Sequence, residues 1–132
     1  MRQLTLPPSI YPAGALPHGW LLPHCCGIVH HGGFGTTSAG LRAGNPAKVV
    51  PHIADPFFWG QHLHQLSVGM PFIPRSRLKR EGLAAVLKEL AYNEKLHPAA
   101  SILGEKIRTE KGVDNAIRLI EETFYKWFCM AY

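Results

Sequence analysis

The residues best suited to chemistry lie in one glycine-rich segment, His31 to Thr37, which reads HGGFGTT. Glycines let a backbone turn sharply and approach an anion. The free N–H groups of a helix that follows then point at the anion with the positive end of the helix dipole. The hydroxyls of Thr36 and Thr37 and the ring of His31 add further hydrogen-bond donors. This segment therefore predicts a phosphate-binding loop.

Two other nucleotide-binding motifs fit the segment poorly. The phosphate loop of nucleoside triphosphatases ends in Gly-Lys-Ser/Thr, and that ending is absent. The dinucleotide fingerprint would run from Gly33 through Gly35 to Ser38, with serine in the place of the third glycine. Asp55 does lie 20 residues beyond Gly35, so this second motif stays open as an alternative.

Other reactive side chains gather in two groups, His24, Cys25, Cys26, His30 and His31, and then His62 and His64. Adjacent strand residues point to opposite faces and zinc-type spacing is absent, so we predict no metal site. Cys26 falls in an apolar strand, where a free cysteine packs as a small hydrophobe. We expect His30 to be satisfied by backbone hydrogen bonds. The three cysteines form no C-x-x-C pair, which indicates reduced thiols.

The elements that must position the glycine segment follow from the turn residues. Of the 13 glycines and 11 prolines, all but four precede residue 75, so a turn-rich front is followed by a helical back. Short apolar runs in the front predict strands at Ile10 to Leu16, Cys26 to His30, Ala47 to Pro51 and Met70 to Ile73. Helices over Thr36 to Ala43 and Pro56 to Leu66 complete a β-α-β-α-β order, which is typical of a parallel α/β sheet.

Helical spacing dominates after residue 74. An amphipathic helix is predicted from Leu83, Val86, Leu87 and Leu90, and Pro98 separates it from two more helices that flank a turn at Gly112. The last helix carries Phe124, Tyr125, Trp127 and Phe128. These aromatic residues indicate either docking on the same domain or contact with a partner domain. We predict one partial domain over 1–132, with strands and loop in 1–74 and helices in 75–132.

Charge and composition limit the partners. The net charge is +5, but no aromatic stacking pattern or nucleic-acid motif accompanies it, so we predict no nucleic-acid binding. A phosphorylated ligand or a peripheral contact with an acidic membrane suits the charge. Early prolines interrupt any signal sequence, and no apolar run approaches the roughly 20 residues that span a bilayer. We therefore expect a cytoplasmic protein.

The run from Leu16 to Val68 resembles the donor-binding signature of UDP-glycosyltransferases, the group that includes sterol glucosyltransferases and the bacterial enzymes that glycosylate macrolide-type natural products. HHGGFGTT, the LRAGNP turn and the DPFFWG segment follow one another at the family's spacing. The resemblance implies the C-terminal lobe of a GT-B fold, a partial Rossmann-like parallel sheet with flanking helices that lacks its first strands. It also implies transfer of a hexose, with inversion, from a UDP-sugar to a lipophilic hydroxyl acceptor of sterol or macrolide type.

The resemblance also implies a role for each donor-binding residue. His18 would lie beside the uracil, where many relatives have Gln, and His31 would hydrogen-bond the diphosphate. The backbone of Gly33 and Gly35, with Thr36 and Thr37, would hold phosphate oxygens, and Asp55 would accept hydrogen bonds from sugar hydroxyls. Asp55 also suits the cap of the helix that begins at Pro56, and the two roles are compatible. No metal or other cofactor is implied.

Two departures from the family limit what this chain is expected to do. Pro56 stands where the family has Gln, which removes an amide side chain and a backbone N–H near the sugar. The N-terminal lobe, which supplies the catalytic base and binds the acceptor, is absent, so no catalytic residue is assigned. The alternatives are a non-catalytic nucleotide-binding remnant, a subunit of a split enzyme, or a truncated product made unstable by an exposed sheet edge.

Overall fold

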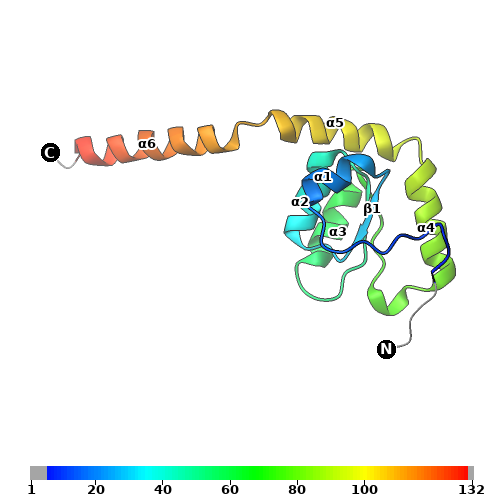
Figure 1. Cartoon of the computed structure of the whole chain (residues 1–132). Helices are drawn as coiled ribbons and strands as arrows, with labels where there is room; N and C mark the ends of the chain where they lie inside the picture. The colour runs from blue at the N-terminus through cyan, green and yellow to red at the C-terminus, as the bar shows by residue number, and fades with distance from the viewer. Residues whose placement is uncertain (1–5, 131–132) are drawn as a thin grey trace.

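The structure, a computed structural model, describes residues 6–130, with side chains as far as residue 128. Three short parallel strands lie in the order β1 (Ile28–His30), β2 (Ala47–Val49) and β3 (Gly69–Met70). Helices α2 (Phe34–Ala43) and α3 (Pro56–Gln65) connect them, as Figure 1 shows. The predicted β-α-β-α-β order and parallel sheet are therefore confirmed.

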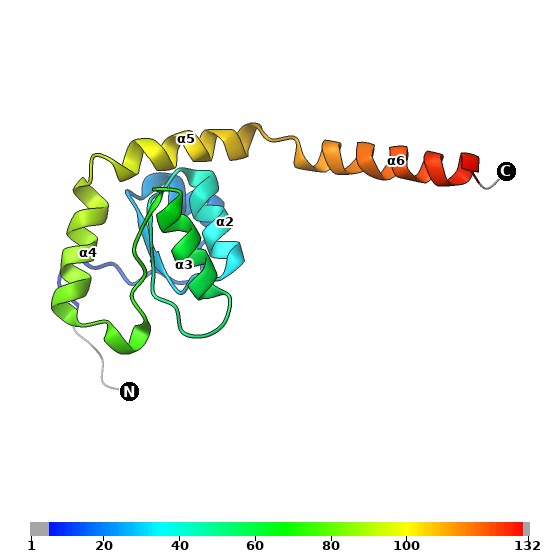
Figure 2. The same cartoon turned by 180° about the vertical axis from the view of Figure 1, so that it is seen from behind.

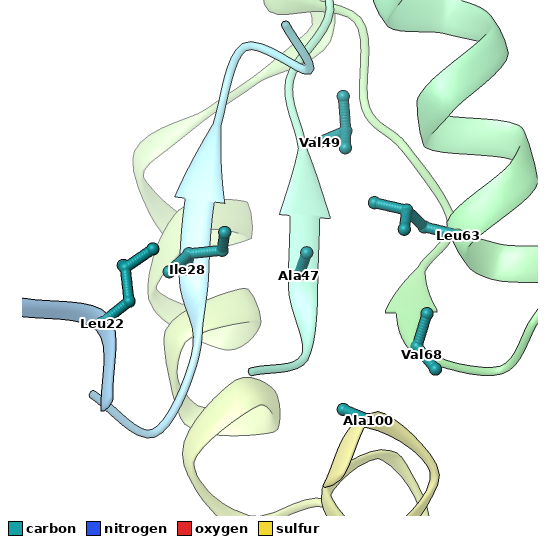
Figure 3. Close-up of a cluster of buried hydrophobic side chains, with 7 residues drawn as sticks. All are labelled: Leu22, Ile28, Ala47, Val49, Leu63, Val68 and Ala100. Carbon is teal, nitrogen blue, oxygen red and sulfur yellow. The ribbon is translucent and has the colours of Figure 1, made fainter. Parts of the chain in front are cut away.

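The hydrophobic core lies where the sheet meets its helices. It is formed by buried apolar side chains from several elements, Leu22, Ile28, Ala47, Val49, Leu63, Val68 and Ala100. In Figure 3, Leu63 of α3 points toward β2, while Ala100 of α5 (Leu96–Thr109) lies beyond the amino ends of the strands. Because α5 covers that end, the loops that leave the carboxyl ends of the strands are free to build a site.

Two further helices pack against this body. α4 (Arg80–Tyr92) buries Val86 and Leu90 but leaves Leu87 53% exposed, so its buried stripe is narrower than its apolar spacing predicts. α5 crosses α2 so closely that a Cβ at Gly104 would lie 2.8 Å from the Cα of Gly44. Short helical turns complete the chain, α1 (His18–Leu21) and η1 (Leu22–His24) before β1, and η2 (Arg75–Arg77) before α4. None of the helices in residues 6–130 is long and apolar enough to cross a membrane.

The last helix, α6 (Gly112–Met130), projects away from the body in both Figures 1 and 2. Its apolar side chains are exposed: Ile120 is 68% exposed, Phe124 61% and Trp127 77%. Together with Leu119 and Thr123, these residues line a shallow apolar hollow on the helix. The interpretation that the aromatic end docks on its own domain is therefore wrong for the described residues.

One predicted strand does not form. Ile10 to Leu16 pairs with no other strand in the described part of the chain, and Ile10 is 53% exposed. The N–H of Ile10 instead donates to the carbonyl of Pro7 at 2.9 Å, which closes a turn. Pro12 lies within the predicted strand and has no N–H for a ladder, which explains why the apolar pattern misled the prediction.

The apolar run of β2 also contains a buried lysine. Lys48 is 4% exposed, and its ammonium donates a hydrogen bond to the carbonyl of Pro71. Burial lowers the pKa of Lys48 below its ordinary value of 10.5. The side chain thus links β2 to the segment just after β3.

The close crossing of α5 over α2 is testable with a pair of glycine substitutions. Gly104→Ala would place a methyl group against Gly44 and the carbonyl of Leu41, so we expect it to lower the free energy of unfolding by about 1–3 kcal/mol. Gly82→Ala makes the same change in α4, where nothing lies within 4 Å. There we expect a gain of about 0.5–1 kcal/mol, because alanine loses less backbone entropy. Urea denaturation measures both, and equal effects would contradict the packing.

Candidate functional site

The glycine segment forms a tight turn between the carboxyl end of β1 and the start of α2. Gly32 has φ +96°, in the left-handed region that favours glycine. A Cβ at Gly32 would lie 2.6 Å from Cγ1 of Val49 and 2.9 Å from Cβ of Pro56. Both the backbone conformation and the space around it therefore require glycine at this position.

The amino terminus of α2 is open. Gly33 is its N-cap, and no side chain caps the helix. The first N–H to find an acceptor is that of Thr37, which donates to the carbonyl of Gly33 at 3.0 Å. The N–H groups of residues 34–36 have no acceptor among the described residues, and no acidic residue lies in the first turn. An open helix start of this kind, with free N–H groups and the positive end of the dipole, is suited to an anion.

Two of the predicted hydrogen-bond donors beside the start of α2, His31 and Thr37, differ in exposure. A Cβ at Gly33 would be 2.4 Å from Nε2 of His31, so the exposed His31 ring lies over the start of α2. The Thr37 side chain is 2% exposed, and its hydroxyl donates to the Gly33 carbonyl at 3.0 Å. Thr36 is half-buried and Gly35 is exposed, with nothing within 4 Å of a Cβ placed there.

His30, the last residue of β1, is hydrogen-bonded to the glycine turn through its side chain. The N–H of Gly32 donates to its Nδ1 at 3.1 Å, while its Nε2 is buried without a partner among the described residues. Burial, followed by the charges that His31 and His18 can carry, lowers the pKa of His30 from 6.5 to about 4. Because the charge of His18 acts on His30, His18, the exposed first residue of α1, lies near the same end of the sheet as His31.

Asp55 begins the helix that follows β2. It occupies the N-cap position of α3, but its side chain makes no capping hydrogen bond and is exposed. Pro56 behind it is buried against the Gly32 turn, with its Cα 3.0 Å from a Cβ placed on Gly32. Asp55 therefore lies on the loop next to the glycine turn, with its carboxylate free of protein partners among the described residues.

Aromatic residues of α2 and α3 meet beside this end. The rings of Phe34 and Trp59 have centroids 5.3 Å apart, and Phe58 stacks on His62 at 5.6 Å. Phe34 and Phe58 are 62% and 61% exposed, and Trp59 is half-buried. Phe58 is therefore a surface residue of α3.

A neighbouring hollow of about 500 Å³ contains none of the predicted site residues. It lies beyond the Asp55 loop and is lined by residues that follow β2 and β3, including His52, Phe57, Pro74 and Arg75. The binding chemistry at the open end of α2 comes from its free N–H groups. We therefore place the candidate site at the glycine turn.

The other reactive groups form no second centre. No three histidine, cysteine or acidic side chains in the described residues are placed to hold a metal ion. Cys25 and Cys26 are free thiols, and Cys26 is exposed before β1 begins, contrary to the expected burial. The side chain of Cys129 lies outside the described residues.

Sequence reasoning assigned no specific role in this site to Gly32 or His30. The double glycine marks a turn, but only the positions of Val49 and Pro56 decide which glycine takes the positive φ. For His30, the expected backbone hydrogen bond exists at Nδ1, but the buried and unpartnered Nε2 depends on tertiary contacts that no spacing reveals.

With this geometry established, comparison with known proteins decides the family. Residues 2–118 match the family described as Erythromycin biosynthesis protein CIII-like, C-terminal domain. The chain belongs to this family of glycosyltransferase C-terminal domains. The recognised resemblance and the GT-B fold class are thereby confirmed.

Individual relatives agree. The O-mycaminosyltylonolide 6-deoxyallosyltransferase of Streptomyces fradiae is 40% identical over 84% of this chain and 29% of its own length. The sterol 3-beta-glucosyltransferase of Pichia angusta is 40% identical over 89% of this chain and 9% of its own. The solved glycotransferase of kitacinnamycin matches with a TM-score of 0.81 and 26% identity, over 92% of this chain and 31% of that one. The chain thus spans less than a third of the length of each relative.

Two glycines of the turn should respond differently to alanine. Gly32→Ala meets Val49 and Pro56 in a conformation that L side chains rarely adopt, so we expect it to lower the free energy of unfolding by at least about 2 kcal/mol. Gly35→Ala meets open space within α2, and we expect no loss of stability. Urea denaturation of both variants provides the measurement, and a tolerant Gly32 would contradict the turn geometry.

Proposed function

We propose that this chain is the donor-binding half of an inverting UDP-sugar glycosyltransferase that acts in the cytoplasm. With an acceptor-binding lobe, it transfers a hexose to a lipophilic hydroxyl compound of sterol or macrolide type. The observation that carries the proposal is the open amino terminus of α2, with unpaired N–H groups, no acidic residue in its first turn and the His31 ring over Gly33. Membership of a glycosyltransferase family supports the same chemistry.

The two ends of a sugar nucleotide suit the two parts of the site. The diphosphate would accept hydrogen bonds from the N–H groups at the start of α2, from Thr36 and from His31. The free Asp55 carboxylate, on the adjacent loop, would accept hydrogen bonds from sugar hydroxyls. His18 would contact the base. As UDP departs, the dipole of α2 and the His31 ring would stabilise the charge that develops on the diphosphate without a metal ion.

Pro56 distinguishes this chain from relatives with Gln at this position. It is buried against the Gly32 turn, where proline also suits the first turn of α3. An amide at this position would offer the sugar a donor and an acceptor, each worth about 1–3 kcal/mol in a closed polar site. We therefore propose a weaker contribution from the sugar than from the nucleotide to donor affinity.

The base that deprotonates the acceptor is not assigned in this chain, so activity requires a second lobe. We propose that this lobe covers the apolar face of α6, defined by Ile117, Ile120, Phe124 and Trp127. An isolated amphipathic helix is marginally stable in water unless its apolar face packs on a partner. More than two thirds of the length of the S. fradiae relative lies outside the matched segment, which is enough chain for such a lobe.

A second candidate function is a nucleotide-binding subunit that has no catalytic role of its own. The small share of each relative's length that this chain covers favours it. The chain accounts for 29% of the S. fradiae relative, and the matched part holds no assigned base. The donor site would then serve binding alone. The two candidates differ in whether added acceptor lobe produces glycosyl transfer.

Donor binding is the first test. Amide NMR titration of the full chain with UDP-glucose should shift the signals of residues 32–37. His31→Ala should weaken binding by roughly ten- to a hundredfold, because it removes a charge-assisted hydrogen bond worth about 1.5–3 kcal/mol. His52→Ala, at an exposed histidine outside the site, serves as the control, and chelation with EDTA should change nothing. Unchanged spectra at millimolar UDP and UDP-glucose would overturn the proposal.

The role of α6 is tested by mixing the chain with an acceptor-binding lobe and measuring transfer from UDP-glucose to a sterol. We expect transfer only in the mixture. Phe124→Asp should abolish it while leaving donor binding unchanged, because a charge in an apolar interface is costly. Tyr125→Asp changes a neighbour roughly 100° around the helix and should retain transfer. Donor binding without transfer in every mixture would instead favour the binding subunit.

A further inference from the structure

The two nitrogens of His30 are in opposite situations. Nδ1 accepts a hydrogen bond from the N–H of Gly32 at 3.1 Å. Nε2 is buried and has no hydrogen-bond partner among the described residues. An imidazole that accepts at Nδ1 and is neutral must carry its proton on Nε2. The structure therefore assigns His30 one tautomer, and its remaining donor is left unused.

The accepted hydrogen bond falls on the most constrained residue of the turn. Gly32 is buried, has φ +96° and leaves no room for a Cβ beside Val49 and Pro56. Its N–H points to the ring of His30, two residues earlier, and a buried N–H without an acceptor would be costly. The orientation of the Gly32 peptide in turn determines the position of Gly33, the N-cap of α2.

The unpartnered Nε2 indicates that stability alone does not explain why a histidine occupies position 30. A buried donor without an acceptor costs free energy in the folded state. The strand that contains His30 is already joined to its neighbour through the backbone, since the N–H of Val50 donates to the His30 carbonyl at 2.8 Å. An apolar side chain at position 30 would remove the unpartnered donor, but it would also remove the acceptor for Gly32.

We propose that His30 is the positioning residue of the phosphate-binding turn. As a neutral imidazole, it holds the Gly32 peptide so that the N–H groups at the start of α2 and the His31 ring converge on the diphosphate. This inference rests on the proposed donor site. It assigns His30 no contact with the ligand, because Nε2 is buried and Nδ1 is occupied by Gly32.

Protonation of His30 would abolish this support, since a charged imidazole donates from both nitrogens. The charges that bear on the ring are those of His31 in the turn and His18 in α1, and both oppose its protonation. Because the pKa falls from 6.5 to about 4 on folding, the unfolded chain binds the proton more readily. The stability that depends on neutral His30 is complete above pH 6.5 and declines as the pH falls toward 4.

The test compares two substitutions in the full chain by UDP-glucose titration at pH 7.5. His30→Asn keeps an acceptor that can bond to the N–H two residues on, so affinity should stay within about threefold of the wild type. His30→Leu has no acceptor, and affinity should fall at least about tenfold while the thermal midpoint changes little. A merely structural role would lower both together. His24→Asn makes the same change at an exposed histidine outside the turn and serves as the control.

Two further measurements keep the inference decidable if His30→Leu does not fold. Nitrogen-15 NMR of the wild-type imidazole should show the Nε2–H tautomer, and a proton on Nδ1 would overturn the inference. Between pH 7 and pH 4.5, the stability of the wild type should fall more steeply than that of His30→Asn. If His30→Leu folds and binds UDP-glucose as tightly as the wild type does, the inference is also overturned. Absence of binding by the wild type would instead refute the proposed donor site.

Discussion

The space around Gly32 is the constraint on which the rest of the site depends. Its backbone passes between Val49 at the end of β2 and Pro56 at the start of α3, in a conformation with φ +96°. Three elements therefore meet at one peptide. A displacement of any of them would move the first turn of α2, and with it the free N–H groups and the His31 ring.

The same contact brings two kinds of polar group together. The start of α2 offers donors and a positive dipole end, and the neighbouring loop offers the free carboxylate of Asp55. A ligand with an anionic centre and a hydroxyl-rich end matches this pair. α6 projects away from the body, as Figure 2 shows, and its apolar side chains are exposed.

Much of the framework was predictable from residue patterns, because turns and periodicity are local. The glycine segment and the parallel order of three strands appear as spacing predicts. The bounds of some elements differ: β3 shares only Met70 with its predicted strand, and Gly112 begins α6 instead of forming the turn before it. A prediction was wrong where the residue pattern had no packing or pairing partner in the folded chain. Ile10 to Leu16 has a strand's composition but no strand to pair with among residues 6–130.

The sequence alone determined that a strand ends in HHGGFGTT, that a helix follows, and that this combination can bind a phosphate, because these properties depend on residue type and order. Only the tertiary structure decided which glycine adopts the left-handed conformation, that Asp55 leaves its helix uncapped, and that His30 has one satisfied and one buried, unpartnered nitrogen. These outcomes depend on atoms from β1, β2 and α3 that are distant in the chain, and local patterns contain no information about such distances.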